Sequence, residues 1–391
     1  MKIALITETY PPQINGVSRT LEHLTQYLCH HGHRMLVVAP DYQEPEKADK
    51  LTEIHCPQRL RLRSTPLPFY KEVVIPLPPY TRMRKAIQVF QPDLVHIATE
   101  GPLGLTALRF CQRQRIPVVS SFHTNFDAYA SHYHMSMISP LVLRYLRWFH
   151  NQTLATFVPS QTVIRELQTQ GFQGLRLWSR GVDTKLFHPH RAGSSALRRQ
   201  LGIPEQAFVA GHCGRLASEK NIEFLGKALA GFLAENAEAH VLIVGDGPGR
   251  LSLDQQIRKR IHDCTRLHFT GYLCGEALAN AYSAMNAFAF ASRTETFGNV
   301  ILEAAASGLP VVAIAEGGPR DVIQNGRTGQ LIAPKSSPEA MTEVLLDWSL
   351  DQNRKEYLAK EARKYAEEQT WDRIMAGLLE DYQKVLSMTK N

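Results

Sequence analysis

Short apolar runs alternate with amphipathic segments of helical length from one end of the chain to the other. Within the runs the apolar residues are continuous, which is typical of strands buried on both faces of a parallel sheet. In the first half the pattern predicts strands at Lys2–Ile6, Arg34–Ala39, Leu94–Ile97, Val118–Phe122 and Ala155–Pro159, and helices at Ser18–His30, 102–114 and 137–151.

The pattern starts again after residues 188–196, which are rich in Pro, His, Gly and Ser and which we interpret as a linker. The strands predicted beyond it are Phe208–Cys213, His240–Val244, Leu267–Thr270, Ala287–Ala291, Val311–Ile314 and a short edge strand at Gly329–Ala333. We therefore expect an α/β protein with two doubly wound, Rossmann-like domains at 1–188 and 189–370. A C-terminal helix at about 371–391 is expected to pack back on the first domain, and the crevice between the domains is the expected ligand site.

Composition narrows the class of protein. Apolar residues make up 44% and charged residues 21% of the chain, which is ordinary for a globular protein and excludes a fibrous or disordered one. The longest apolar runs, such as Leu309–Ala315, are far shorter than the ~20 residues of a membrane span. The six cysteines show no CxxC spacing and are interpreted as reduced thiols, so we expect a cytoplasmic protein.

The net positive charge is confined to the first half of the chain. Residues 1–190 carry 21 Lys and Arg against 13 Asp and Glu, a net charge of +8, whereas residues 191–391 carry 23 against 24, a net charge of −1. Seven of the cations and a single anion, Glu72, fall between Arg59 and Lys85, interleaved with Leu, Phe and Tyr. A solvated face and contact with an anionic membrane both fit this segment. Nucleic-acid binding is disfavoured because helix-turn-helix and aromatic signals are lacking.

Two local patterns, clusters of histidines and a glycine-rich turn, suggest a metal or a dinucleotide cofactor, but their sequence context argues against both. The histidines at 30, 31 and 33 and at 132 and 134 have no further ligand at zinc spacing, so we expect no metal site. The glycine-rich turn at 245–250 follows the second predicted strand of its domain, whereas a dinucleotide fingerprint opens the first. We interpret it as a strand-to-helix turn, not as an NAD site.

Three loops carry residues of types that bind ligands. The loop around Gly16 leads from the first strand into the first helix, where free N–H groups can bind an anion. Arg215 and Lys220 follow the first strand of the second domain and can clamp a diphosphate, although Arg215 can equally form an ion pair with Glu219. Glu295 and Glu303 bracket a Phe-Gly turn, and they can bind a ligand with many hydroxyl groups beside a helix N-terminus.

These pieces together resemble the retaining GT-B glycosyltransferases of family four. The matching segments occur in the family's order across nearly the whole chain: TxxYPPxxNGV from residue 7, SSFHTNF at 120–126, VPS at 158–160, SRGVDTKLF at 179–187, GRLASEK at 214–220 and ETFGNVILE at 295–303. One departure is Asn15 before Gly16, where many relatives have a second glycine. Asn tolerates positive φ well, so we expect the turn to be kept.

The resemblance implies a role for each matching residue. Glu303 would bind the ribose hydroxyls, Glu295 the donor sugar, and Arg215 and Lys220 the diphosphate. The other implied site residues are Gly16, which lets its loop approach the donor, His123 near the reacting face of the sugar, and the turn and helix start at Phe297, Gly298, Asn299 and Val300.

The implied function is transfer of a hexose, of mannose or glucose type, from a nucleotide diphosphate sugar, with retention and without a metal or other cofactor. The favoured acceptor is a membrane lipid or lipid-linked glycan, and the expected location is cytoplasmic and peripheral on the inner membrane face, through Arg59–Lys85. A sugar-nucleotide epimerase of the same fold and transfer to a soluble carbohydrate remain alternatives. The motif residues do not distinguish a guanine donor such as GDP-mannose from a uracil donor such as UDP-glucose.

Overall fold

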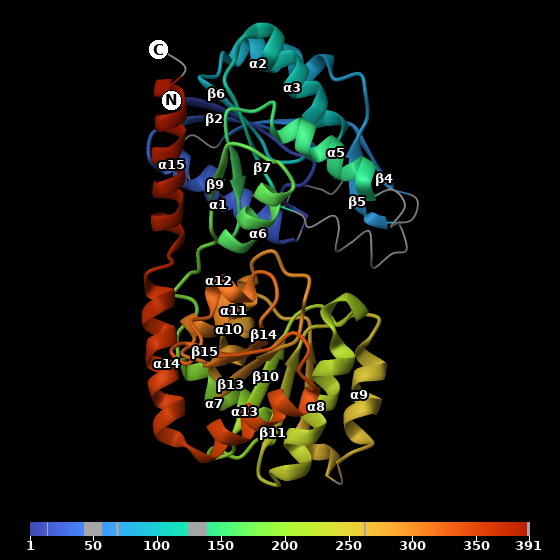
Figure 1. Ribbon diagram of the computed structural model, residues 1–391, viewed down its shortest axis with the longest axis vertical. Helices are drawn as coiled ribbons and strands as arrows, with labels where there is room; N and C mark the ends of the chain where they lie inside the picture. The colour runs from blue at the N-terminus through green and yellow to red at the C-terminus, as the bar shows by residue number, and fades with distance from the viewer. Residues whose placement is uncertain (14, 43–56, 68–69, 124–138, 262, 389–391) are drawn as a thin grey trace. The chain divides into compact units, whose positions relative to one another are not determined.

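The chain divides into two compact units, which we describe separately (Figure 1). The first unit comprises Met1–Ser179 and Ile374–Asn391, and the second comprises Arg180–Arg373. The structure, a computed structural model, describes residues 1–13, 15–42, 57–67, 70–123, 139–261 and 263–388.

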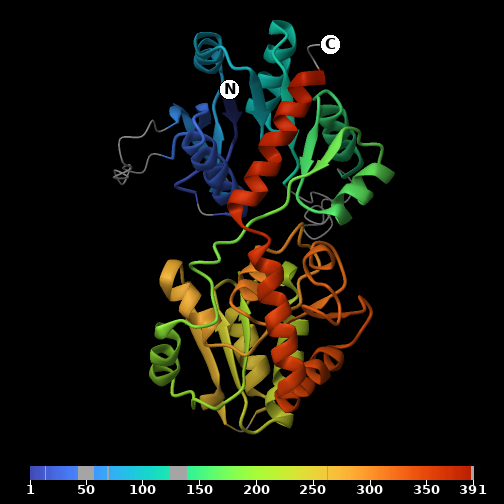
Figure 2. The same cartoon turned by 90° about the vertical axis from the view of Figure 1, so that its left-hand side faces the viewer.

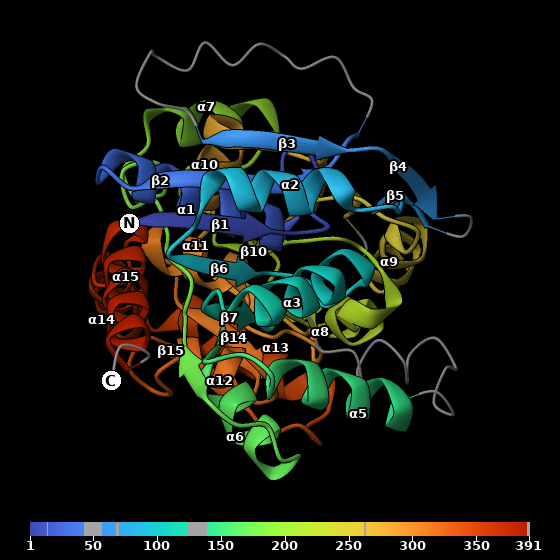
Figure 3. The same ribbon diagram turned by 90° about the horizontal axis from the view of Figure 1, so that it is seen from above.

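The first unit is built on a seven-stranded sheet with the order β3-β2-β1-β6-β7-β8-β9, in which all neighbouring strands are parallel. Figure 3 shows β3, β2, β1, β6 and β7 one beside the next in this order. The strands are β1 (Lys2–Ile6), β2 (Arg34–Pro40), β3 (Gln58–Leu62), β6 (Leu94–Ile97), β7 (Val118–Ser121), β8 (Thr156–Val158) and β9 (Leu175–Leu177), and β4 (Ser64–Leu67) and β5 (Tyr70–Pro76) form an antiparallel pair. The helices are α1 (Gly16–His30), α2 (Thr81–Phe90), α3 (Pro102–Gln114), α5 (Ser139–His150), α6 (Gln161–Thr169) and α15 (Trp371–Met388), whose first three residues belong to the second unit.

The second unit has a six-stranded parallel sheet with the order β12-β11-β10-β13-β14-β15. Its strands are β10 (Val209–Cys213), β11 (His240–Val244), β12 (Leu267–Gly271), β13 (Ala287–Phe290), β14 (Val311–Ile314) and β15 (Gly329–Ile332). Its helices are α7 (Ala192–Gln200), α8 (Ile222–Glu235), α9 (Arg250–Arg258), α10 (Gly275–Ser283), α11 (Asn299–Ala306), α12 (Pro319–Val322), α13 (Pro338–Leu350) and α14 (Gln352–Glu367), with 3₁₀ turns at Ser218–Lys220 and Cys264–Arg266.

Both faces of the second sheet are buried, which explains why most positions of its strands are apolar. In β11, Leu242 and Val244 pack in one core cluster with α10 and α11, whereas Val241 and Ile243 pack in another with α8 and α13. Successive side chains of a strand point to opposite faces, so a strand covered on both sides needs no polar position. The predicted doubly wound α/β class is confirmed in both units.

Within the first sheet, the two strands that the apolar pattern missed are the edge strands. The outermost strands β3 and β9 carry the sequences QRLRL and LRL, and their arginines interrupt the apolar run that the prediction required. An edge strand is covered on fewer sides, so it accommodates charged residues that a central strand excludes. The expected linker at 188–196 was also partly wrong, because α7 begins within it at Ala192.

The C-terminal helix α15 packs against the sheet of the first unit (Figure 2). Tyr382 of this helix is completely buried, and its ring lies edge-on to Phe157 of β8 at a centroid distance of 5.6 Å. The neighbouring Asp381 forms an ion pair with Arg176 of β9 at 2.7 Å. The last helix of the chain is therefore anchored to three elements of the first sheet's second half, since Tyr382 also contacts His96 of β6.

Candidate functional site

The candidate residues lie where the strand order of each sheet reverses. In the second unit the chain leaves β10 for β11 and β12 on one side and returns on the other with β13, so the loops after β10 and β13 lie side by side. In the first unit β1 and β6 form the same kind of switch point, and β7 lies next to β6. Open parallel sheets bind ligands at the carboxyl ends of such strands.

The loop after β10 holds both cations predicted for the second unit. Lys220 ends a 3₁₀ turn, and its Nζ contacts Glu295 Oε1, with both side chains about one fifth exposed. Arg215 is half exposed, and its Nη2 contacts Oε1 of the buried Glu219. The ion pair considered from the sequence for Arg215 is therefore present, while Lys220 is joined to a carboxylate that follows β13.

Two further hydrogen bonds fasten the loops after β10 and β13 together. Asn221 Nδ2 donates to the carbonyl of Ala291 at 3.2 Å, and Thr294 Oγ1 donates to the carbonyl of Glu219 at 3.3 Å. The glycine-rich turn at 245–250 supports the first of these loops from the other side, because Gly249 N donates to Leu216 O at 2.8 Å. The interpretation of this turn as a strand-to-helix connection is confirmed, since α9 begins at Arg250.

The Phe-Gly turn approaches another backbone segment closely. Gly298 has φ of 94°, in the left-handed region that favours glycine, and it precedes α11 without a side-chain cap. The N–H of Gly318 donates to Glu295 O at 2.8 Å, and a Cβ on Gly318 would lie 2.5 Å from Phe297 backbone atoms. The Gly317-Gly318 segment therefore fixes Glu295 and the start of α11 by direct backbone contact, with Phe297 buried between them.

Glu303 lies on the second turn of α11 and is only 7% exposed. The hydroxyl of Tyr282, on α10, donates a hydrogen bond to Glu303 Oε2 at 3.0 Å. Burial raises the pKa of Tyr282 well above 10, and the charge of Glu303 raises it further, so the tyrosine stays a donor. Sequence reasoning found Glu303 but missed Tyr282, whose role depends on the packing of α10 against α11.

In the first unit, the loop after β1 is closed by side-chain hydrogen bonds. Asn15 is the N-cap of α1, with Oδ1 accepting from Ser18 N at 2.8 Å, and Gly16 is the first helical residue. The turn does not use the tolerance of Asn for positive φ, since the φ of Asn15 is −153°. The reason is that an N-cap needs extended backbone and a short side-chain acceptor, and Asn supplies both.

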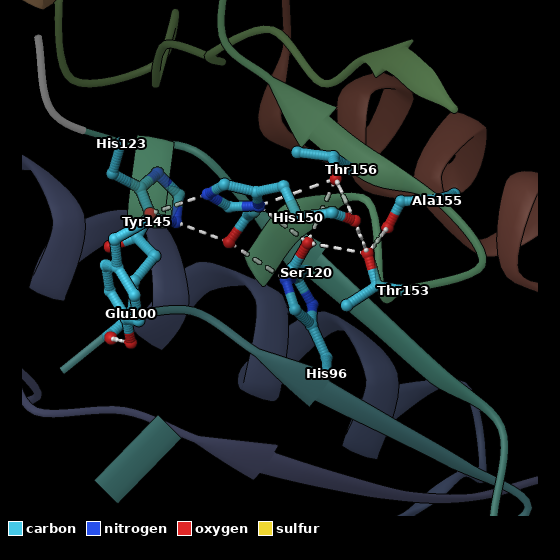
Figure 4. A network of polar contacts seen from close by, with 10 residues as sticks. His96, Glu100, Ser120, His123, Tyr145, His150, Thr153, Ala155 and Thr156 are labelled. Carbon is cyan, nitrogen blue, oxygen red and sulfur yellow. Dashed lines mark hydrogen bonds and ion pairs between the residues drawn. The ribbon is translucent and has the colours of Figure 1, made fainter. Parts of the chain in front are cut away.

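His123 follows β7 and is half-buried. Its Nε2 lies 2.7 Å from Ser121 Oγ, which lies 2.9 Å from Nε2 of the buried His96 on β6. Nδ1 of His96 lies 2.5 Å from the Tyr382 hydroxyl. Burial lowers the pKa of His96 to about 3, so its ring is neutral. Figure 4 shows His96 and His123 in this network of polar contacts.

A second set of polar contacts starts from the preceding residue of β7. Ser120 Oγ lies 2.8 Å from Nδ1 of the buried His150, whose Nε2 lies 3.0 Å from Glu100 Oε1 (Figure 4). Glu100 follows β6, and Glu8 follows β1, so both carboxylates lie at the switch point. Burial raises the pKa of Glu8 above 4.5, and the charge of Glu100 raises it further, while the N–H of Leu103 lowers it.

Sequence reasoning missed Glu8, Glu100 and His96. A signal was present for His96, because a histidine within the otherwise apolar run LVHI must be buried and must find hydrogen-bond partners there. Of the two histidine clusters considered for a metal, His132 and His134 lie outside the described residues. Within the part of the chain that the structure describes, no group of three or more His, Cys, Asp and Glu could hold a metal ion.

Two family models cover most of the chain. Residues 14–186 match the model described as Glycosyltransferase Family 4, and residues 194–365 match the one described as Glycosyl transferases group 1. The first match ends at residue 186 and the second begins at residue 194, whereas the structural division falls between Ser179 and Arg180.

Curated relatives and a solved structure match nearly the whole chain. A GDP-mannose-dependent alpha-mannosyltransferase of Mycobacterium tuberculosis is 33% identical over 98% of this chain and 97% of that protein. A GDP-mannose-dependent alpha-(1-6)-phosphatidylinositol monomannoside mannosyltransferase of the same species is 28% identical over 96% and 97%. The crystal structure of Anabaena HepE with UDP superposes with a TM-score of 0.77 at 21% identity, covering 98% of this chain and all of that one, which shows a shared fold.

Proposed function

The chain belongs to glycosyltransferase family 4, with the GT-B fold, and on that premise we propose that it transfers mannose from GDP-mannose to a membrane lipid or lipid-linked glycan. As a family member it is a hexosyltransferase that acts on a lipid or glycan acceptor. The observation that carries the choice of donor is that both mycobacterial relatives are GDP-mannose-dependent, and one of them acts on a phosphatidylinositol mannoside.

We assign the donor-binding role to the second unit. The buried carboxylate of Glu303, oriented by Tyr282, accepts hydrogen bonds from the ribose hydroxyls, and the loop of Phe297 and Gly298 binds sugar and phosphate at the start of α11. Arg215 and Lys220 bind the diphosphate. Because both cations contact carboxylates in this structure, donor binding exchanges these partners for phosphate oxygens, and it leaves Glu295 for the sugar hydroxyls.

The proposed mechanism follows from the charges that develop on the sugar and the diphosphate as their bond breaks. Breaking the bond between sugar and phosphate gives a sugar of oxocarbenium character and a diphosphate with additional negative charge. Arg215, Lys220 and the N-terminal amides of α11 stabilise that charge as it develops. We propose retention at the anomeric carbon: the acceptor attacks from the side of the leaving group, and a leaving phosphate oxygen takes the acceptor's proton. His123 of the first unit contacts the transferred sugar in this proposal.

A panel of nucleotide sugars tests the choice of donor. A ligand that binds only the native state raises the melting temperature, by an amount that grows with its affinity. We expect GDP-mannose and GDP to raise the melting temperature more than UDP-glucose and UDP at equal concentration. A larger rise with the uracil compounds would replace the proposed donor and leave the family assignment intact.

We propose that α2 is the part of the basic segment that contacts an anionic membrane. Its three cations, Arg82, Arg84 and Lys85, are exposed, and no acidic residue lies on the helix. Val89 is 76% exposed on the same helix, so positive charge and apolar surface occur together, as on helices that lie on membranes. Arg61 has a different role, because its guanidinium donates to the carbonyls of Pro11 and Pro40 within the unit.

Replacing Arg82, Arg84 and Lys85 with Ser should release the protein from anionic vesicles. Each cation near an anionic surface contributes about 1 kcal/mol, which salt screens. The measurement is co-sedimentation with vesicles of phosphatidylglycerol and phosphatidylcholine at physiological salt, in parallel with affinity for GDP-mannose, which should not change.

The matched control removes three exposed cations from the second unit, with Arg199, Lys259 and Arg260 replaced by Ser. This variant has the same net charge as the α2 variant, and we expect it to remain on the vesicles. Equal co-sedimentation of the α2 variant and the natural protein would mean that α2 is a solvated face, and it would favour a soluble carbohydrate acceptor.

None of the described helices is both long enough and apolar enough to span a membrane.

A further inference from the structure

Three hydrogen bonds connect His123 with the last helix of the chain. They run from His123 Nε2 to Ser121 Oγ at 2.7 Å, from Ser121 Oγ to His96 Nε2 at 2.9 Å, and from His96 Nδ1 to the Tyr382 hydroxyl at 2.5 Å. Each intermediate group can donate only one hydrogen, because a serine hydroxyl has one and a neutral imidazole has one N–H. A serine oxygen can accept two hydrogen bonds, but a buried O–H or N–H without an acceptor is costly. When every hydrogen of the buried Ser121 and His96 must find an acceptor within the series, the direction of one bond determines the direction of the others.

The tyrosine end of the series fixes the direction. Tyr382 is completely buried, and within the described part of the chain its hydroxyl has His96 Nδ1 as its hydrogen-bond partner. If His96 donated to the tyrosine oxygen, the tyrosine O–H would be left buried without an acceptor, at a cost of ~1–3 kcal/mol. Tyr382 therefore donates, and His96 Nδ1 accepts.

The remaining hydrogens then follow in order. His96 is neutral, because burial lowers its pKa to about 3, so the single N–H of its ring lies on Nε2 and donates to Ser121 Oγ. The serine hydrogen is left to donate to His123 Nε2. A nitrogen that accepts a hydrogen bond carries no hydrogen, so neutral His123 bears its hydrogen on Nδ1.

We propose that Tyr382, acting through His96 and Ser121, holds neutral His123 in the tautomer with hydrogen on Nδ1. Tyr382, His96 and Ser121 are positioning residues in this arrangement. The catalytic consequence rests on the proposed function: Nδ1–H is the ring group that donates a hydrogen bond to a hydroxyl of the transferred sugar. Tyr382 of the C-terminal helix thus determines which nitrogen of His123 donates. It does so from a distant part of the sequence, since His96 and Tyr382 alone are 286 residues apart.

The tautomer can be observed directly by long-range ¹H–¹⁵N correlation spectra of protein labelled at histidine, without donor or acceptor. The His123 signals are assigned by their loss in His123→Gln. We expect the Nδ1–H pattern alone in the natural protein. In Tyr382→Phe either direction of the series leaves one ring nitrogen of His96 without a partner, so the direction is no longer fixed and the Nε2–H pattern of His123 should appear beside the Nδ1–H pattern. Ser121→Ala should give the same change, whereas Ser121→Thr keeps a hydroxyl and should restore the Nδ1–H pattern.

Two controls separate this effect from general disturbance of the fold. Tyr80→Phe removes another buried tyrosine hydroxyl of the first unit, which donates to Pro76 O at 2.9 Å, and should leave the His123 tautomer unchanged. Asp381→Asn weakens the ion pair with Arg176 that anchors α15 beside Tyr382, and should also leave it unchanged. A change in Tyr80→Phe would assign the effect to general disturbance of the fold, and a change in Asp381→Asn would assign it to docking of α15; either result would overturn the proposal.

Turnover gives the catalytic readout. Loss of the group that orients a catalytic histidine costs up to ~10⁴ in serine proteases, and for an effect relayed through two residues we expect kcat to fall about tenfold in Tyr382→Phe. An Nε2–H pattern in the natural protein, or the Nδ1–H pattern alone in Tyr382→Phe, would overturn the proposal. A changed tautomer with unchanged kcat would overturn the catalytic consequence alone. A failure of the proposed donor or acceptor would leave the spectra of the unliganded protein as expected.

Discussion

Replacing Lys220 with Ala should lower turnover by about 10²–10³, and replacing Arg215 with Ala should have an effect of the same order. Each variant removes a charged donor directed at the negative charge that develops on the diphosphate, and preorganised donors of this kind contribute that much to catalysis. The measurement is kcat with saturating donor and acceptor, with the melting temperature as a check that the fold is intact.

A nearby lysine provides the control for this prediction. Lys227 is about half exposed on α8, where it pairs with Glu223 one turn away, so it has the charge of Lys220 without its place at the switch point. Lys227→Ala should change turnover less than twofold, because surface pairs of this kind contribute little. A loss below tenfold in both Lys220→Ala and Arg215→Ala would contradict the diphosphate clamp.

Replacing Glu303 with Gln should weaken the binding of free GDP by about tenfold or more. Hydrogen bonds to a charged group contribute about 1.5–3 kcal/mol, and 1.4 kcal/mol corresponds to a factor of ten in affinity. Gln is the better substitution than Ala because its carbonyl can still accept the hydrogen bond from Tyr282, so no buried hydroxyl loses its acceptor. The measurement is calorimetric titration with GDP and with GDP-mannose.

Glu295→Gln is the matched variant, and it should behave differently. Its carboxylate contacts Lys220, so neutralising it frees this cation for the diphosphate, and GDP binding should stay equal or become tighter. Affinity for intact GDP-mannose should fall relative to that for GDP, because the sugar loses a charged acceptor. Equal weakening of GDP binding in both variants would show that the two carboxylates do not divide the ribose and the sugar between them.

The sequence predicted the strands of the second sheet and the central strands of the first, and it missed the two edge strands of the first sheet, for one physical reason. A strand with helices on both faces, such as β13 or β14, is apolar at successive positions, and that continuity is visible in the sequence. The edge strand β3 carries Arg59 and Arg61 and has no such continuity. The basic segment therefore contains three strands that its charge alone did not indicate: β3 in the main sheet, and β4 paired with β5.

Local motifs predicted the residues of the candidate site. They did not predict the hydrogen-bond partners that come from distant parts of the chain. Arg215, Lys220, Glu295 and Glu303 lie in contiguous motifs, and the structure brings Lys220 and Glu295 into contact. Tyr282 and Tyr382 have no motif, since their roles arise only when α10 packs on α11 and α15 on the first sheet. Hydrogen-bond partners of buried polar groups are set by tertiary packing, which no spacing rule encodes.

The roles of the site residues are proposals that depend on the reaction itself. Both the clamp and the His123 tautomer concern a transfer in which the sugar–phosphate bond breaks and the diphosphate leaves. A direct observation of that transfer therefore tests more of the account than any single variant.

The most direct test is to incubate the protein with GDP-mannose labelled with ¹³C at the anomeric carbon and with vesicles that contain phosphatidylinositol and diacylglycerol, and to follow the label by NMR. We expect the label to leave GDP-mannose, to appear in the lipid fraction with the α configuration of the donor, and to stay in GDP-mannose with Lys220→Ala over the same time. A β-linked product, or release of free mannose with no transfer to lipid or to any added glycan, would contradict the account.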